Sequence, residues 1–230
     1  MTPGRRAAAE FVGTAFLLAA VVGSGIMGQR LSGGNDGLAL LANAIATGGA
    51  LVALILTFGP VSGAHFNPLV SIGLAAVREF AWRDVALYVP AQVAGALAGV
   101  FSAHAMFDLP ILQWAARPRP GMALMWSEFV ATAGLLAVVL IGVRKNSASI
   151  PYAVAGYIVA AYWFTASTSF ANPAVTLARA LTDTFAGIDP RDLWGFLVAQ
   201  LAAAATAVPA IYWILRGRGG SVTPGTEDFP

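Results

Sequence analysis

A short polar sequence that occurs twice holds the residues best suited to chemistry, and that chemistry is hydrogen bonding. The first copy, residues 62–71, reads SGAHFNPLVS, and the second, residues 167–176, reads STSFANPAVT. Each contains an Asn-Pro pair, Asn67-Pro68 or Asn172-Pro173, followed by an apolar run. An Asn side chain caps the N-terminus of a helix, and Pro fits the first helical position, where its missing N–H costs nothing. Each copy therefore predicts the start of a short helix.

The two predicted helices, at about 68–77 and 173–184, are too short to cross a membrane. At roughly 1.5 Å per residue they reach about 15–18 Å, half of a hydrocarbon core. A broken helix at membrane depth is tolerated only where it packs in protein or lines a wet cavity. Helix N-termini carry positive partial charge, so two that meet at the midplane favour neutral polar solutes and repel cations. Asn-Pro is also a common turn dipeptide, but two copies in matching places favour a shared site.

The composition is that of an integral membrane protein. Of 230 residues, 58% are hydrophobic and only 10% are charged, whereas soluble domains carry about 25% charged residues. The formal net charge of +2 predicts no nucleic-acid partner. The chain has no cysteine, two separated histidines, no nucleophile–base pair and no phosphate loop. The sequence therefore predicts no enzyme, no cofactor and no metal site.

Apolar segments predict an all-α membrane protein with six spanning helices around the two short ones. The spans are expected at about 8–27, 38–58, 85–107, 122–143, 150–165 and 193–215. The longest loop, 108–121, lies between the third and fourth spans. The tail, 216–230, is rich in Gly, Pro and Thr and is expected to be disordered.

The two halves of the chain resemble each other beyond the Asn-Pro pairs. Residues 9–15 (AEFVGTA) match residues 127–133 (SEFVATA), and Gln92 matches Gln200. Since each half has three spans, an odd number, the second half must enter the membrane from the opposite face. The sequence thus predicts one domain, 1–230, built as an inverted 3+3 repeat. The repeats are expected at about 8–107 and 122–215.

Lys and Arg residues are more numerous on the side that holds both termini, which predicts that both termini are cytoplasmic. That side is expected to carry eight of them: Arg5, Arg6, Arg78, Arg83, Arg144, Lys145, Arg216 and Arg218. The other side is expected to carry five: Arg30, Arg117, Arg119, Arg179 and Arg191. The short termini are typical of a bacterial protein, so we expect the bacterial inner membrane.

These features together resemble the aquaporin (major intrinsic protein) family. The resemblance rests on Asn67-Pro68-Leu69, Asn172-Pro173-Ala174, the preceding residues 62–66, and the paired Glu10 and Glu128. It implies a passive channel, with six helices around one pore in each subunit of a homotetramer in the lipid bilayer. It also implies that the side-chain amides of Asn67 and Asn172 meet at the pore centre and donate to the passing solute.

Two departures from the family pattern concern the solute. In the family, Arg usually follows the second Asn-Pro-Ala and forms part of the outer selectivity filter, but this chain has Val175. Leu69 replaces the Ala of the first motif, and we expect the asparagines to keep their role. By family spacing the other filter positions are Thr47, Ala160 and Ser169. A filter of small, uncharged residues implies passage of water and of larger neutral solutes: glycerol, urea or, favoured here, metalloid hydroxides such as arsenite.

Four further residues admit two interpretations each. Glu10 and Glu128 are expected to accept hydrogen bonds from backbone N–H groups of the short-helix loops, the alternative being proton coupling in a transporter. His65 is expected to line the cytoplasmic vestibule, the alternative being a pH-sensitive gate. Arg179 lies one helical turn after Val175, where it either anchors the interface or restores positive charge at the outer mouth.

The competing functions are therefore a water-selective aquaporin and a proton-coupled secondary transporter. A water-selective pore is disfavoured because the usual filter Arg and His are absent. A cation leak through the arginine-free filter is a further alternative. We expect the positive ends of the short helices to prevent it, because they remain after the side chain is lost.

Overall fold

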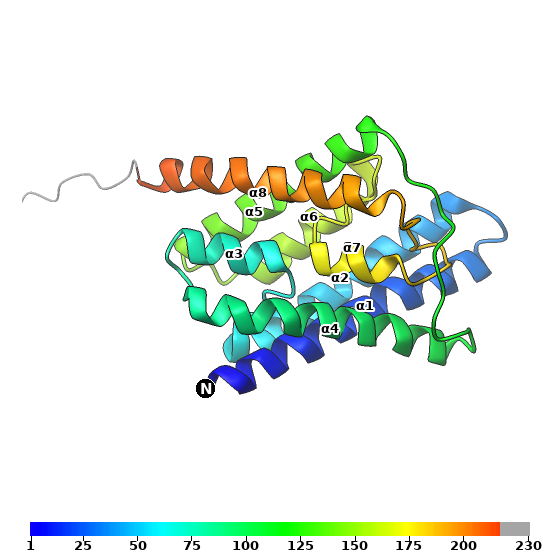
Figure 1. Cartoon of the computed structure of the whole chain (residues 1–230), viewed down its shortest axis with the longest axis horizontal. Helices are drawn as coiled ribbons and strands as arrows, with labels where there is room; N and C mark the ends of the chain where they lie inside the picture. The colour runs from blue at the N-terminus through cyan, green and yellow to red at the C-terminus, as the bar shows by residue number, and fades with distance from the viewer. Residues whose placement is uncertain (217–230) are drawn as a thin grey trace, which may run out of the picture.

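The computed structural model describes residues 1–216, and within this range the protein consists of helices and their connections. Figure 1 shows the helices packed side by side, with the start of the first and the end of the last at the same end of the molecule. The eight helices are α1 (Pro3–Leu31), α2 (Asp36–Ser62), α3 (Pro68–Ala76), α4 (Trp82–Met106), α5 (Met122–Arg144), α6 (Ile150–Phe164), α7 (Pro173–Arg179) and α8 (Leu193–Arg216). The predicted disorder of the tail concerns residues that, apart from Arg216 at the end of α8, lie outside the described range.

The expected pattern of six long helices and two short ones is confirmed. Five of the long helices have the length and hydropathy of membrane spans. The sixth, α6, is apolar but has 15 residues, or about 22 Å, so it is shorter than a hydrocarbon core of about 30 Å. α6 leads directly into the segment before α7, and α6 and α7 belong to the same half of the chain (Figure 1).

The second short helix ends earlier than the sequence suggested. We expected it to reach residue 184, but α7 stops at Arg179 after seven residues. The chain then turns back, and the backbone N–H of Ile188 donates to the carbonyl of Arg179. The hydroxyls of Thr182 and Thr184 hydrogen-bond to each other, 2.9 Å apart, instead of facing lipid. The Thr182 hydroxyl also lies 2.8 Å from Nε2 of His104 on α4. These hydrogen bonds, within the turn and to α4, therefore replace the helical turn that an apolar run predicted.

The two halves have the same design in opposite directions, which confirms the inverted repeat. Figure 1 shows α3 and α7 starting near the centre of the molecule and running to opposite ends. α3 ends towards the end of the molecule where α1 begins and α8 ends, here called the termini end. α7 ends towards the opposite end, here called the far end, which the connecting segment 107–121 crosses.

Close contact between α1 and α4 depends on two glycines. A Cβ atom on Gly95 would overlap the carbonyl oxygen of Phe11, and one on Gly99 would overlap that of Ala15. Backbones of membrane helices approach this closely only at small residues. The pair α1–α4 is thereby fixed, and the side chains of α1 that point inward are held in place.

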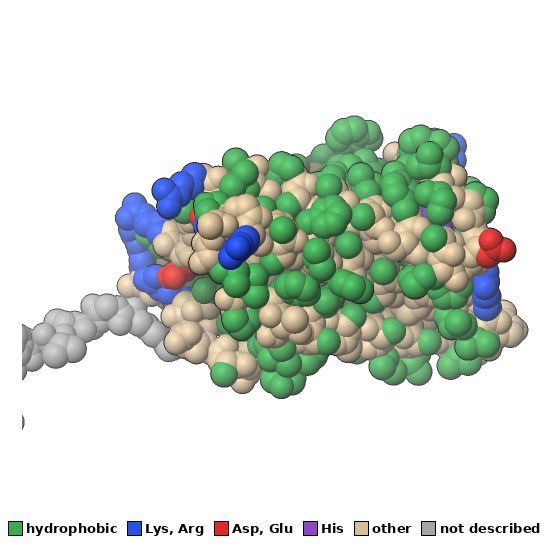
Figure 2. All heavy atoms as spheres, turned by 90° about the horizontal axis from the view of Figure 1, so that it is seen from below, with side chains coloured by type: hydrophobic (Ala, Val, Ile, Leu, Met, Phe, Trp, Pro, Cys, Tyr) green, Lys and Arg blue, Asp and Glu red, His purple; other side chains and the backbone are tan. Residues whose placement is uncertain are grey.

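The surface matches a protein surrounded by lipid. Figure 2 shows Lys and Arg mostly at the two ends, with a broad band of hydrophobic and uncharged side chains between them. Large exposed hydrophobic residues come from most of the long helices, for example Phe16, Ile45, Trp126 and Val198. With five helices of spanning length, the chain is a multi-pass membrane protein.

The tight α1–α4 contact gives a first prediction. Replacing Gly99→Ala is expected to lower the free energy of unfolding by about 2 kcal/mol, because the added methyl group forces the two backbones apart. Thermal unfolding of the detergent-solubilised protein measures the effect. The control is Gly156→Ala, since a Cβ there meets nothing within 4 Å. Equal stability of the Gly99→Ala protein and the wild type would show that the close approach of α1 and α4 at Gly99 does not contribute to the free energy of unfolding.

Candidate functional site

The two asparagines cap the two short helices in the same way. The backbone of each is extended, with φ of −151° at Asn67 and −158° at Asn172. The Asn67 side-chain oxygen accepts from the N–H of Leu69 at 2.9 Å. The Asn172 oxygen accepts from Ala174 at 3.0 Å and from Val175 at 3.3 Å. Capping fixes which way each amide nitrogen points.

The side-chain nitrogens of the asparagines join the two halves at the centre of the molecule. Asn67 Nδ2 donates to the carbonyl of Ala171, and Asn172 Nδ2 donates to the carbonyl of Phe66, each at 2.8 Å. Each asparagine thus satisfies the carbonyl that precedes the other asparagine. A primary amide has two N–H groups, so each side chain keeps a second donor in addition to this exchange.

Glu10 supports the loop before α3. Its carboxylate accepts four hydrogen bonds: from the Ser62 hydroxyl, the Gln92 amide, and the backbone N–H groups of His65 and Phe66. The distances lie between 2.7 and 2.9 Å. Phe66 has φ of 48°, a left-handed conformation that a non-glycine residue adopts only when its surroundings hold it.

Glu128 does the same for the loop before α7. It accepts from the N–H of Phe170 at 2.8 Å, the N–H of Ala171 at 2.9 Å and the amide of Gln200 at 2.7 Å. Ala171 has φ of 48°, like Phe66 in the first half. Both carboxylates are fully buried. The sequence duplication has therefore produced two matching supports for two strained loops.

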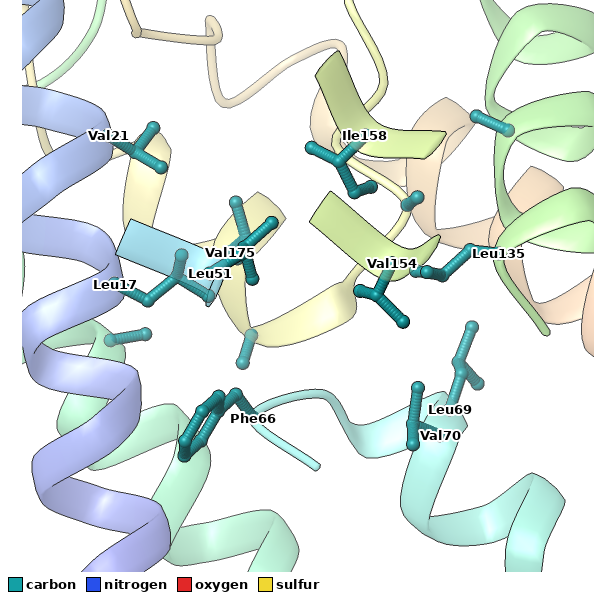
Figure 3. Close-up of a cluster of buried hydrophobic side chains, with 14 of the residues drawn as sticks. Leu17, Val21, Leu51, Phe66, Leu69, Val70, Leu135, Val154, Ile158 and Val175 are labelled. Carbon is teal, nitrogen blue, oxygen red and sulfur yellow. The ribbon is translucent and has the colours of Figure 1, made fainter. Parts of the chain in front are cut away.

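A long cavity of about 800 Å³ passes both asparagines. It begins among Arg6, Glu79 and Asn146 at the termini end and reaches Thr47, Phe170 and Arg179 near the far end. Much of its wall is apolar, and Figure 3 shows these side chains around one space: Leu17, Val21, Leu51, Phe66, Val70, Leu135, Val154, Ile158 and Val175. The two asparagines thus place polar groups at the centre of a mainly apolar passage.

A smaller cavity of about 340 Å³ lies at the far end. Asp36, Asn43, Arg117, Arg119 and Phe185 line it. The side chain of Arg179 lines this cavity as well as the long one, so it lies in the wall between them.

Comparison with known proteins identifies this architecture. The sequence profile described as Major intrinsic protein matches residues 2–160. The chain belongs to the major intrinsic protein family. Proteins of this family are channels, so the prediction that the chain is not an enzyme is confirmed, and it forms a passive channel for water or small solutes.

Two curated relatives and one solved structure show the degree of similarity. The chain is 54% identical over 212 residues to "Aquaglyceroporin AqpS" of Rhizobium meliloti (strain 1021), covering 92% of this chain and 91% of the relative. It is 30% identical to "Aquaporin NIP6-1" of Arabidopsis thaliana, covering 87% of this chain and 65% of the relative. The structure of the aquaglyceroporin from Plasmodium falciparum superposes with a TM-score of 0.68 at 20% identity, covering 93% and 95% of the two chains, which shows the shared fold.

Three of the four positions expected in the family's filter line the long cavity: Thr47, Ser169 and Val175. Thr47 on α2 lies opposite α6, with its hydroxyl 3.3 Å from that of Tyr162. The Ser169 hydroxyl has no hydrogen-bond partner within residues 1–216. Val175 lies in the first turn of α7 beside Asn172, which places an apolar group at the point where the family usually has its arginine.

The fourth position, Ala160, does not line the cavity and is exposed on the outer surface of α6. Tyr162 occupies the wall instead, together with Val154 and Ile158. Two residues along a helix correspond to about 200° of rotation. A filter position counted two residues too early from Asn172 therefore falls on the lipid-facing side of α6 instead of the pore-facing side. The four-residue spacing of 154, 158 and 162 is the signal that identifies the inward face.

The remaining motif residues are buried where the halves meet or line the mouths. Pro68 and Pro173 begin α3 and α7, and Leu69 and Ala174 are buried beside them. His65 lines the cavity near the termini end, where its Nδ1 lies 3.0 Å from the Ser71 hydroxyl and its ring packs edge-on against Phe80 and Tyr88.

Arg179 is not at the lipid interface, which was one of its two expected places, because only 2% of its surface is exposed. Its Nε donates to the carbonyl of Ala186, and its guanidinium carbon lies 3.4 Å from the centre of the Phe170 ring. Arg119, which lines the smaller cavity, was not among the site residues expected from the sequence. It reaches in from the connecting segment 107–121, and its guanidinium carbon lies 4.9 Å from the same ring.

The matching carboxylates give a second prediction. Replacing Glu128→Gln is expected to lower the free energy of unfolding by about 3 kcal/mol, because an amide NH₂ then faces backbone N–H donors in a buried site. Thermal unfolding of the solubilised channel measures it. The matched control is Glu79→Gln, which removes an exposed ion pair with Arg144 and is expected to cost less than about 1 kcal/mol. Equal losses in the two variants would contradict the supporting role of Glu128.

Proposed function

We propose that this channel admits uncharged solutes larger than water, of the size of glycerol, urea and metalloid hydroxides such as arsenite, in addition to water. The observation that carries the proposal is the apolar Val175 at the position where the family usually has its filter arginine. Without a guanidinium at that position, the cavity of about 800 Å³ continues past both asparagines to the level of Thr47 and Phe170.

The chemistry of the cavity wall at this level suits a polyol or a trihydroxide. The hydroxyls of Thr47 and Tyr162 lie on one side, and the apolar Val175 and Ile158 also line the space. A polyol with a hydroxylated edge and a carbon edge satisfies both surfaces at once, and a metalloid trihydroxide can hydrogen-bond to the hydroxylated side. Tyr162 narrows the passage more than the expected Ala160 would, but it adds a hydroxyl. The similarity to a relative named an aquaglyceroporin supports the same choice.

A water-selective aquaporin is the alternative, and two filter positions of this chain disfavour it. Neither the usual filter histidine nor the usual arginine occupies its family place in this chain. A guanidinium next to the asparagines would narrow the passage, whereas Val175 presents only methyl groups there.

A proton-coupled transporter is the second alternative, and the hydrogen bonding of its candidate carboxylates disfavours it. Glu10 and Glu128 are fully buried and accept four and three hydrogen bonds from protein donors. Protonation of either would break contacts that hold a loop in a strained conformation. A carboxylate in this setting serves the fold rather than a proton cycle.

The setting of the channel is part of the same proposal. The excess of Lys and Arg at the termini end supports a cytoplasmic location of both termini, which makes the far end the outer mouth. We place the protein in a bacterial inner membrane as a homotetramer with one pore in each subunit, as its resemblance to the family implies. Positive helix ends at the asparagines and the cationic Arg179 together exclude cations.

The experiment that tests the proposed solutes is stopped-flow light scattering on proteoliposomes, with arsenite uptake measured in parallel. The wild type is expected to pass glycerol and urea as well as water. Replacing Val175→Arg is expected to slow glycerol about tenfold or more, because the guanidinium narrows the passage by the asparagines. Val175→Ala is the control, because it removes bulk without adding charge. If the wild type passes water alone, the proposal that the filter admits larger solutes is wrong.

Transport is expected to be independent of a proton gradient. Imposing an inward or outward pH difference of one unit across the proteoliposome membrane should leave the initial rate of glycerol uptake unchanged. Accumulation of glycerol above its outside concentration would instead support coupling, and would make Glu10 and Glu128 the first carboxylates to replace.

A further inference from the structure

The cavity at the far end is lined by an unusual number of arginines. Arg117 and Arg119 come from the connecting segment 107–121, and Arg179 comes from the end of α7. The space measures about 340 Å³, which is ample for a small ion with part of its hydration shell. We refer to it as the arginine vestibule.

No described carboxylate forms an ion pair with these three arginines. Within residues 1–216 none of them forms an ion pair with an Asp or Glu oxygen within 4.0 Å. The nearby acids are engaged elsewhere: Asp183 and Asp192 accept from backbone N–H groups, and Asp189 pairs with Arg191. Glu128, whose charge reaches Arg119 and Arg179, accepts from the N–H groups of its loop and from Gln200. Asp36 is the one acid that lines the vestibule. A buried charge without a counter-ion is costly, so an excess of positive charge here calls for a compensating anion.

Two of the guanidinium groups lie against one aromatic ring and keep N–H donors without protein partners within residues 1–216. Arg179 and Arg119 lie against the same ring, with their guanidinium carbons 3.4 and 4.9 Å from the centre of Phe170. Backbone carbonyls hold them in place: Arg119 donates to Gly187 at 2.9 Å and to Ser167 at 3.1 Å. Both terminal nitrogens of Arg179 and one of Arg119 form no hydrogen bond with any described residue. These three nitrogens are not among the unpaired side-chain N and O atoms that are fully buried, so each of them borders open space.

We propose that the arginine vestibule is a binding site for a small tetrahedral oxyanion, such as sulfate or inorganic phosphate, taken from the surrounding solution. Arg119 and Arg179 hold it with charge-assisted hydrogen bonds, and Arg117 adds positive charge at the rim. Guanidinium groups bind such anions through paired, geometrically matched N–H groups. The negative charge of Asp36, which also lines the vestibule, limits the site to a small anion.

Occupation of this site closes the channel at its far mouth. Arg179 lines both the vestibule and the long cavity, so an anion on its terminal nitrogens lies across the path between the two. A neutral solute that uses the same donors must displace the anion. The site therefore makes the channel sensitive to the oxyanion concentration on that side of the membrane.

The binding half of the proposal does not depend on which neutral solute the channel carries. It is tested by isothermal titration of sodium sulfate into the purified full-length channel in a zwitterionic detergent, at constant ionic strength. Saturable binding of one sulfate per chain is expected. Arg117→Gln should weaken it at least threefold, and it keeps the fold because the Arg117 side chain only stacks on Phe185. Arg119→Lys should weaken it further, since a lysine keeps the charge but loses the planar group.

The matched control is Arg30→Gln. Arg30 also stacks on a phenylalanine and lies at the far end, but it does not line the vestibule. Its replacement removes the same unit of charge and should leave sulfate binding unchanged. Equal weakening by Arg30→Gln and Arg117→Gln would show that the overall positive charge of this end attracts sulfate, and that no specific site binds it. Absence of saturable binding in the wild type, which is the outcome if the arginines serve only to repel cations, would overturn the proposal.

The closing half is tested with water, whose passage does not require the wide filter. Sulfate on both sides of the proteoliposome membrane is expected to slow osmotic water flow in the wild type, relative to chloride at equal osmolarity and ionic strength. In Arg117→Gln the half-maximal slowing is expected at an at least threefold higher sulfate concentration. Sulfate binding without slower water flow would place the anion away from the path.

Repeating the titration with added phosphatidylglycerol distinguishes a lipid phosphate, which would compete with sulfate, from the free anion proposed here.

Discussion

The structure depends on the requirement that every backbone N–H and C=O inside a membrane finds a partner within the protein. Two half-length helices break this rule at the bilayer centre, where their entering loops leave polar groups without helical partners. Two asparagines and two glutamates restore it. Each asparagine binds the carbonyl before the other, and each glutamate binds the N–H groups of one loop. The polar path through the protein exists because these partners leave one amide hydrogen of each asparagine unused.

Duplication of the chain supplies these partners in matching pairs, but the two ends of the passage have diverged. At the termini end, the long cavity opens beside ion pairs such as that between Arg144 and Glu79. At the far end, three arginines gather without such partners. The central symmetry thus serves stability, whereas the asymmetry of the loops determines which solutes and ions meet the passage. Selectivity can change at one mouth without disturbing the centre.

Sequence reasoning could predict the parts of this protein that follow from local pattern. Asn-Pro pairs, apolar lengths and the internal repeat are enough to place eight helices and to pair Glu10 with Glu128. Features that depend on rotation or on tertiary contact were out of reach. Ala160 proved to face outward and Tyr162 inward, because a helix turns by about 100° per residue. The early end of α7 and the position of Arg119 depend on a loop that folds over the far end, and no local pattern encodes that contact.

The crossed hydrogen bonds at the centre also constrain how the protein is made. While only the first half has left the ribosome, the carbonyl of Phe66 and the amide of Asn67 lack the partners that residues 171 and 172 will provide. An unpaired polar group in hydrocarbon costs several kcal/mol, so α3 cannot rest stably at mid-membrane depth at that stage. Biogenesis must therefore shelter the first loop, with water or with the insertion machinery, until the second half arrives. The passage is completed late, and a truncated chain has no route to a tight pore.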